Sequence, residues 1–185
     1  SVNNLSKNFS SFEAVKEISF SINESEILGL LGPNGCGKTT TIGMMLGLLK
    51  PTSGEVIING LNVEKNRINL LKKMNFISPY IELPKKLTVK ENLMVYGKLY
   101  SVNGINNRID YLTETLRLNE FINKKTGELS SGQKNRVSLA KAVVNDPDIL
   151  LLDEPTASLD PETGDFVRTF IEKISSEKKM SILLA

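Results

Sequence analysis

Two spacings of apolar residues divide the chain into predicted strands and predicted helices. Apolar residues alternate or run together, as is typical of β-strands, at residues 18–22, 26–31, 55–60, 74–77, 148–152 and 181–184. They recur every three or four residues, as is typical of amphipathic helices, at residues 38–49, 88–100, 105–116 and 130–143. Strands alternate with helices at both ends of the chain, which predicts an α/β fold with a mostly parallel sheet.

The middle of the chain, residues 88–145, carries long helical patterns and no strand pattern. Its first helix is predicted to begin at Thr88, which has the capping-box spacing to Glu91. A further helix is predicted after this stretch, where Asp160 precedes Pro161 in the pattern of an N-cap and a first helical residue. We therefore predict an inserted all-helical subdomain at 88–145 and a core with an antiparallel β part near the N-terminus, made of residues 1–87 and 146–185.

Composition excludes several classes of protein. The chain has 185 residues, 40% hydrophobic and 24% charged, which is typical of a folded domain and not of a disordered chain. Its 23 basic and 21 acidic residues are spread along the sequence, so no nucleic-acid partner is expected. No apolar run reaches the roughly 20 residues of a membrane-spanning helix. A single cysteine, Cys36, excludes an internal disulfide and fits a reducing compartment such as the cytoplasm.

A glycine-rich turn between a predicted strand and a predicted helix is the clearest candidate for chemistry. Residues 32–40 read Gly-Pro-Asn-Gly-Cys-Gly-Lys-Thr-Thr and fit G-x-x-x-x-G-K-[ST] at every fixed position, which predicts a P-loop NTPase. Such a turn surrounds phosphates with backbone N–H groups and a helix N-terminus. Lys38 would reach the outer phosphates, the Thr39 hydroxyl would bind Mg²⁺, and Thr40 would contact an inner phosphate. The other candidate nucleotide contacts in the loop are Asn34, Gly35, Cys36 and Gly37.

An apolar strand that ends in two carboxylates is the second candidate. Residues 149–154 read Ile-Leu-Leu-Leu-Asp-Glu. A buried parallel strand delivers its last side chains to the crevice at its carboxyl end, where ligands bind. Asp153 is therefore expected to hold Mg²⁺ through its water shell. Glu154 is expected to orient, or accept a proton from, the water that attacks the outer phosphate. Two solvated acids closing a strand are the alternative, which the accompanying phosphate loop disfavours.

A third segment, residues 129–133, reads Leu-Ser-Ser-Gly-Gln and lies about twenty residues before these carboxylates. By itself it predicts only a loop and a helix N-terminus, with Ser130 as N-cap and Gly132 allowing close backbone approach. With the three motifs in this order, the chain resembles the ATP-binding cassette of ABC transporters. The resemblance extends over essentially the whole chain, with 129–133 as the signature motif and 150–154 as the magnesium-binding strand with the catalytic glutamate.

Two weaker matches extend the resemblance. Residues 158–160 resemble the family's D-loop, which includes Asp160. Residues 5–9 resemble the segment whose aromatic side chain stacks on adenine, and this match implies that role for Phe9. An isolated Phe in a core is the alternative reading of that residue.

What the resemblance implies is an ATPase that works as a dimer and drives a transporter. In this family two cassettes, identical or different, meet head to tail, so that each ATP lies between the phosphate loop of one and the signature motif of the other. The residues implied to act across that interface are Ser130, Ser131, Gly132 and Gln133. ATP hydrolysis with Mg²⁺ would drive a separate integral membrane subunit, and the cassette would sit at the cytoplasmic face of the cell membrane. Residues 154–161 resemble export-type systems, so export is favoured.

The sequence departs from the family in three places. Ser131 stands where the signature motif usually has glycine, and Pro79 stands where the family's Q-loop has glutamine, leaving no side-chain ligand for magnesium there. Ser78, Tyr80 or a water would then complete the shell, or the site would couple differently to its membrane partner. We expect both ends of the chain to be truncated, with the family's switch histidine beyond Ala185.

Two other functions remain open from the sequence. One is a soluble cassette ATPase that acts as a clamp on ribosomes or DNA. The other is an ATP-binding module that assembles but hydrolyses poorly, which Pro79 and Ser131 favour and Glu154 disfavours.

Overall fold

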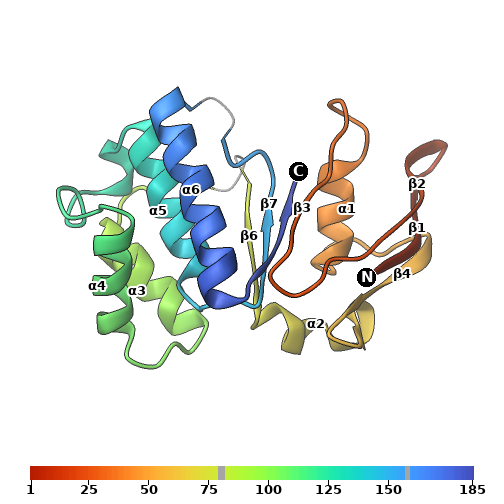
Figure 1. The fold of residues 1–185 in the computed structure, drawn as a ribbon, viewed down its shortest axis with the longest axis horizontal. Coiled ribbons are helices and arrows are strands. Elements are labelled where there is room, and N and C mark those ends of the chain that lie inside the picture. Colours follow the sequence, from red (N-terminus) through yellow and green to blue (C-terminus); the bar gives the residue numbers. More distant parts are fainter. Residues whose placement is uncertain (79–81, 157–158) are drawn as a thin grey trace.

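Two four-stranded β-sheets organise the chain, whose computed structural model describes residues 1–78, 82–156 and 159–185 (Figure 1). The first sheet is parallel and has the order β3-β8-β7-β6, with β3 at Ile27–Gly29, β8 at Ser181–Leu184, β7 at Ile149–Leu152 and β6 at Met74–Ile77. The second is antiparallel and has the order β2-β1-β4-β5, with β2 at Phe12–Phe20, β1 at Val2–Phe9, β4 at Ser53–Ile58 and β5 at Leu61–Asn62. These sheets confirm the predicted α/β fold.

Helices cover both faces of the parallel sheet. They are α1 (Lys38–Met45), α2 (Val63–Leu71), α3 (Val89–Leu99), α4 (Ile105–Thr115), α5 (Ser131–Val143) and α6 (Pro161–Lys178), with a 3₁₀ turn at Thr126–Glu128. In Figure 1, α3 to α6 lie on one side of the parallel sheet, and α1 and the antiparallel sheet lie on the other. The stretch 88–145 is helical and contains no strand, as predicted, apart from an isolated bridge between Thr88 and Lys125.

Each strand at the centre of the parallel sheet contributes to two separate hydrophobic cores. Along β7, Leu150 and Leu152 pack with the helices α3 to α6, whereas Leu151 packs with α1 and the antiparallel sheet. Along β8, Ile182 and Leu183 divide in the same way. Because successive side chains of a strand point to opposite faces, a strand buried on both faces must be apolar throughout. This requirement explains the uninterrupted apolar run before the two carboxylates.

Two predicted helix starts are present with their caps. The Thr88 hydroxyl accepts a hydrogen bond from the Glu91 N–H at 3.1 Å, and the Glu91 carboxylate accepts one from the Thr88 N–H at 2.8 Å. Asp160 caps α6, whose first residue is Pro161. One helix lacks a sequence signal: α2 buries only Val63 and Leu70 and is interrupted by a non-helical residue.

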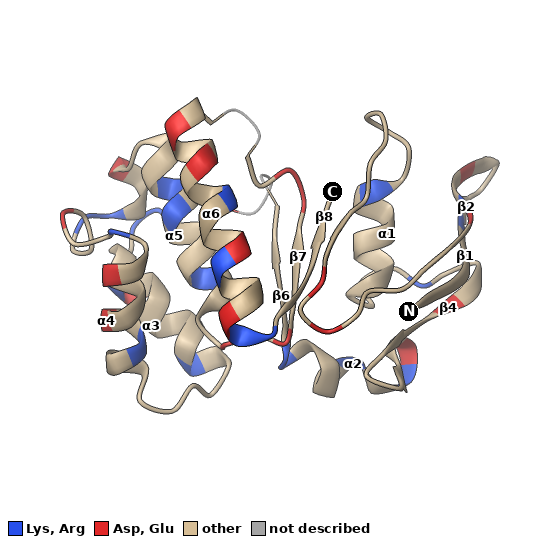
Figure 2. Cartoon of the chain, viewed as in Figure 1, with Lys and Arg blue, Asp and Glu red and all other residues tan. Residues whose placement is uncertain are grey.

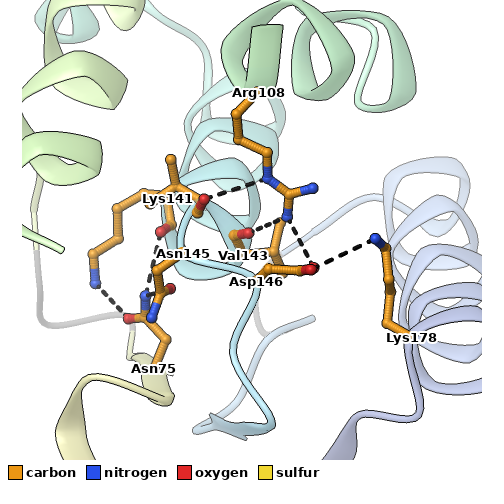
Figure 3. A network of polar contacts seen from close by, with 8 residues as sticks. Asn75, Arg108, Lys141, Val143, Asn145, Asp146 and Lys178 are labelled. Carbon is orange, nitrogen blue, oxygen red and sulfur yellow. Dashed lines mark hydrogen bonds and ion pairs between the residues drawn. The ribbon is translucent and has the colours of Figure 1, made fainter. Parts of the chain in front are cut away.

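A partly buried polar contact attaches α5 to the parallel sheet (Figure 3). The ammonium group of Lys141, on α5, donates hydrogen bonds to the Asn75 side chain at 3.2 Å and to the Phe76 carbonyl at 3.4 Å, both on β6. It also lies 5.2 Å from the centre of the Tyr96 ring on α3. Burial lowers the pKa of Lys141 below its usual value. The Asn75 amide in turn donates to Asn145 at 2.9 Å.

A second set of polar contacts at the same end of α5 joins it to α4 and α6 (Figure 3). The Arg108 guanidinium, on α4, donates to the Val143 and Val144 carbonyls. It also pairs with Asp146 at 3.3 Å, and Lys178, at the end of α6, approaches the same carboxylate at 3.6 Å. Because Arg108 satisfies two of the last carbonyls of α5, the helix end is held by its neighbours.

Charged residues of both signs are spread over the helices and loops, whereas the strands of the parallel sheet carry none (Figure 2). Among the described residues, no helix combines the length and apolar character that crossing a membrane requires.

Candidate functional site

The phosphate loop connects β3 to α1 and lies above the first turn of α1 (Figure 1). Gly35 and Gly37 have φ angles of +83° and +94°, in the left-handed region that favours glycine. A Cβ on Gly37 would lie 2.2 Å from the Ala14 carbonyl oxygen of β2. Only glycine fits at this position, because the loop is pressed against the antiparallel sheet.

Lys38 is folded back across this loop. Its ammonium group donates hydrogen bonds to the carbonyl of Gly32 at 2.8 Å and to that of Pro33 at 3.1 Å. The cation therefore stands at the mouth of the loop, where phosphate oxygens can replace the two carbonyls as acceptors.

Thr39 and Asp153 bring the two predicted halves of the site together. The Thr39 hydroxyl donates a hydrogen bond of 2.8 Å to the Asp153 carboxylate, although 114 positions separate them in the sequence. Asp153 is only 3% exposed, and its backbone N–H donates to the Ile77 carbonyl of β6 at 2.9 Å. Hydroxyl and carboxylate oxygens are ligands that Mg²⁺ prefers, so these two residues fit the expected metal.

Glu154 is exposed and adopts a strained backbone. Its φ angle is +48°, which residues other than glycine rarely adopt. Its N–H donates a hydrogen bond of 2.8 Å to the Ala185 carbonyl, at the end of β8. The turn directs the chain away from the sheet immediately after the buried Asp153, so one carboxylate faces the phosphate loop and the next faces solvent.

Phe9 lies at the end of a hairpin close to the phosphate loop. It pairs with Phe12 across the β1–β2 turn and is 45% exposed, which disfavours a core role. The ammonium group of Lys7 lies 5.1 Å from the centre of its ring. The same hairpin approaches Gly37 of the phosphate loop through the Ala14 carbonyl.

The signature segment forms the N-terminus of α5. The Ser130 hydroxyl accepts a hydrogen bond from the Gln133 N–H at 3.2 Å, and the Gln133 side chain accepts one from the Ser130 N–H at 3.1 Å. This capping box confirms Ser130 as the N-cap. A Cβ on Gly132 would lie 3.2 Å from the Thr163 hydroxyl, so α5 and α6 approach closely at their first turns.

Asp160 joins this segment through Thr163. Its carboxylate accepts hydrogen bonds from the Thr163 N–H at 2.9 Å and hydroxyl at 2.7 Å, and these bonds hold its pKa below the usual value. Residues of the signature and D-loop segments line one cavity of about 570 Å³, which also contains Arg117 and Arg136. No residue of 32–40 lines it. The structure thus separates the phosphate loop and the signature segment into two sites on one chain.

Several sequence predictions lie outside the described residues. They concern Pro79 and Tyr80 in the Q-loop and Ser158 in the D-loop.

Comparison with solved structures defines the class of protein. The dimeric post-hydrolysis state of the ATP-binding cassette MJ0796 bound to ADP and Pi is similar, with a TM-score of 0.88 and 28% identity over 99% of this chain and 85% of that chain. The structure of cbiO1 from Clostridium perfringens, part of the ABC transporter complex cbiONQ, is similar with a TM-score of 0.86 and 29% identity over 100% of this chain and 76% of that chain. The fold and the site therefore define an ATP-binding cassette ATPase.

Sequence comparison gives the family. A profile described as ABC transporter matches residues 15–157. The ABC transporter ATP-binding protein NatA of Bacillus subtilis is 34% identical over 90% of this chain and 69% of its own length. The bacitracin transport ATP-binding protein BcrA of Bacillus licheniformis is 36% identical over 98% and 59%, and the Nod factor export ATP-binding protein I of Burkholderia lata is 40% identical over 86% and 53%. The chain belongs to the ABC transporter family, and it spans 53% to 69% of the length of these three relatives.

Proposed function

We propose that the chain binds ATP and Mg²⁺, dimerises with a second cassette around two ATP molecules, and hydrolyses ATP to drive a separate membrane subunit. The observation that carries this proposal is the Thr39–Asp153 hydrogen bond, because it joins the phosphate loop to the end of β7. Residues 1–87 and 146–185 form the ATP-binding core in this proposal, and 88–145 form the helical subdomain. The protein works at the cytoplasmic face of the cell membrane.

The residues of the site divide the chemistry between them. The loop residues hold the phosphates, chiefly through backbone N–H groups: Asn34, Gly35, Cys36, Gly37, Thr39 and Thr40. Lys38 exchanges its two carbonyl partners for phosphate oxygens and balances their charge. Mg²⁺ held by Thr39 and Asp153 would neutralise further phosphate charge. The Phe9 ring stacks on adenine.

Glu154 acts on water in this proposal. It orients a water molecule and accepts its proton as the oxygen attacks the γ-phosphorus. The bond between the γ-phosphorus and the bridging oxygen breaks, and ADP leaves with that oxygen and its electron pair. The exposed position of Glu154, directly after the buried Asp153, supports this division of roles.

A second cassette is required because the signature segment and the phosphate loop occupy separate sites. Ser130, Ser131, Gly132 and Gln133 would contact the ATP held by the partner, and Asp160 would lie at the same interface. The similar MJ0796 cassette is described as dimeric, which supports this arrangement.

Export is the direction that the relatives favour. One relative is named for Nod factor export and another for bacitracin transport. A third, from Escherichia coli, is named a probable multidrug transporter protein and is 38% identical over 86% of this chain. We propose an exporter whose substrate is determined by the membrane subunit.

Replacing the proposed base tests the chemistry. In the natural protein, Glu154→Gln should nearly abolish ATP hydrolysis while ATP binding persists and the ATP-bound dimer accumulates. Glu172→Gln, an exposed carboxylate on α6, is the matched control and should keep parental turnover. Parental turnover in Glu154→Gln would remove Glu154 from this role.

Cell fractionation tests the transporter assignment. The tagged protein should sediment with membranes, and a crosslinker attached within 78–87 should capture a polytopic membrane protein. Recovery in the soluble fraction with ribosomes or nucleic acid would instead establish the clamp function.

A further inference from the structure

One side chain outside the three motifs joins the start of α5 to the turn that carries Glu154. The Asn135 amide nitrogen donates a hydrogen bond of 3.0 Å to the Pro155 carbonyl. Asn135 lies two residues after Gln133, near the start of α5, and Pro155 directly follows Glu154. This hydrogen bond therefore connects the helix that begins with the signature segment to the proposed catalytic turn.

The turn at Glu154 needs contacts of this kind. Its left-handed φ angle of +48° is unfavourable for an L-residue and persists only where the surroundings hold it. On the N-terminal side of this turn, the Glu154 N–H donates a hydrogen bond to the Ala185 carbonyl. Proline has no N–H, so the Pro155 carbonyl is the only backbone group through which hydrogen bonding can hold that residue. Asn135 supplies that bond.

The rest of the Asn135 side chain argues against a purely stabilising role. Its amide oxygen is buried and has no hydrogen-bond partner among the described residues. Turning the amide around would place this oxygen against the Pro155 carbonyl, so the contact with Pro155 fixes the orientation. A buried acceptor without a partner destabilises the folded state, and an apolar side chain of similar shape would avoid that cost. Because Asn135 stands here in spite of this cost, we infer that its amide donor is needed at this position.

We propose that Asn135 is a positioning residue for Glu154. By holding the Pro155 carbonyl it fixes the left-handed turn that presents the Glu154 carboxylate to the attacking water. It also ties this turn to the helix whose first residues would meet the partner's ATP, so closure at the signature segment sets the position of Glu154 on the same chain. The inference rests on the proposed function, in which Glu154 acts on water.

Three variants of the natural protein test it. Asn135→Leu removes the donor and keeps a similar shape, so kcat should fall at least tenfold while KM for ATP stays within twofold and the ATP-bound dimer still forms. Asn135→Ala loses the same bond and serves if the leucine variant does not fold. Asn135→Gln keeps an amide donor and should retain most of the activity.

A matched control separates positioning from general disturbance of the region. Ser138 lies one turn further along α5 and lines the same cavity of about 260 Å³ as Asn135 and Glu154, but no hydrogen bond joins it to Pro155. Ser138→Ala should keep parental kcat. An equal fall in Ser138→Ala, or a parental kcat in Asn135→Leu, would overturn the inference.

A double variant tests whether Asn135 acts through Glu154. In the Glu154→Gln background, Asn135→Leu should cause no further loss of the residual hydrolysis, since residues that act as one unit are not additive. Fully multiplicative losses would overturn the inference and leave the proposed function intact. Parental turnover in Glu154→Gln alone would refute the proposed function instead.

Discussion

The Thr39 hydroxyl and the Asp153 carboxylate are joined by a hydrogen bond of 2.8 Å, although 114 positions separate them in the sequence. One residue belongs to the first turn of α1 and the other follows the last residue of β7. This contact places the two sequence motifs in one site. The two oxygen atoms are adjacent, as two ligands of one Mg²⁺ ion must be.

Removing this hydrogen bond should lower the free energy of unfolding and weaken the binding of Mg²⁺. Thr39→Val keeps the shape of the side chain but leaves a nearly buried carboxylate without its donor. Hydrogen bonds to charged groups contribute about 1.5 to 3 kcal/mol, so the free energy of unfolding should fall by about 2 kcal/mol. Urea denaturation without nucleotide measures this change. Hydrolysis should also need a higher Mg²⁺ concentration, because one ligand of the metal is lost. Thr39→Ser is the control, and an equal loss in it would contradict the role of the hydroxyl.

The phosphate loop should tolerate a methyl group at one glycine far better than at another. Gly35 and Gly37 both have positive φ angles, but open space surrounds a Cβ on Gly35, whereas one on Gly37 would meet the Ala14 carbonyl at 2.2 Å. Gly35→Ala should therefore cost only the left-handed backbone, about 1 to 2 kcal/mol. Gly37→Ala should cost at least about 3 kcal/mol, since the loop must also move away from β2. Denaturation of the two variants checks this, and equal losses would contradict it.

Local sequence patterns predicted those parts of the fold whose signals are local. β8 and α3 were predictable because their apolar spacing and the Thr88 cap lie within a few residues. β1 was not predictable, because three of its eight residues are Asn and it becomes a strand only through pairing with β2 and β4. The prediction for the first helix extended to residue 49, whereas α1 ends at Met45 and Gly47 then adopts a φ angle of +62°.

In the candidate site, too, only the features with a local sequence signal could be predicted. The phosphate loop could be recognised alone, whereas the signature segment was recognised only from its position relative to the other two motifs. Thr39 and Asp153 were both expected to hold Mg²⁺, and the hydrogen bond between them is seen only in the structure. Asn135 carries no recognisable signal, because its partner Pro155 lies twenty residues away and only the packing of α5 against the end of β7 brings them together. Contacts of this kind depend on tertiary structure and have no periodicity to detect.

The cap at Asp160 should make the stability of α6 depend on pH. Hydrogen bonds from Thr163 lower the pKa of Asp160 in the folded chain, so its carboxylate stabilises the fold above the ordinary aspartate pKa. That contribution is lost as the pH falls through the lowered pKa. Asp160→Asn keeps an oxygen acceptor but cannot titrate, so the parent's advantage in Tm should shrink between about pH 5 and pH 2. Thermal denaturation across this range measures it, and an advantage that did not change with pH would contradict the prediction.

Replacing Phe9 should weaken the binding of the adenine base and leave the binding of the phosphates unchanged. The ring is exposed, and its hairpin contacts the phosphate loop through Ala14. Stacking of a base on an aromatic side chain contributes about 1 to 3 kcal/mol, so Phe9→Ala should weaken ATP binding roughly 5-fold to 150-fold. Binding of inorganic tripolyphosphate should not change, because it has no base, and calorimetric titration of both ligands separates the two effects. Phe12→Ala removes the exposed aromatic ring across the turn and is the control. An equal loss in Phe12→Ala, or a parallel loss of tripolyphosphate binding, would show that the hairpin supports the loop and that Phe9 does not contact adenine.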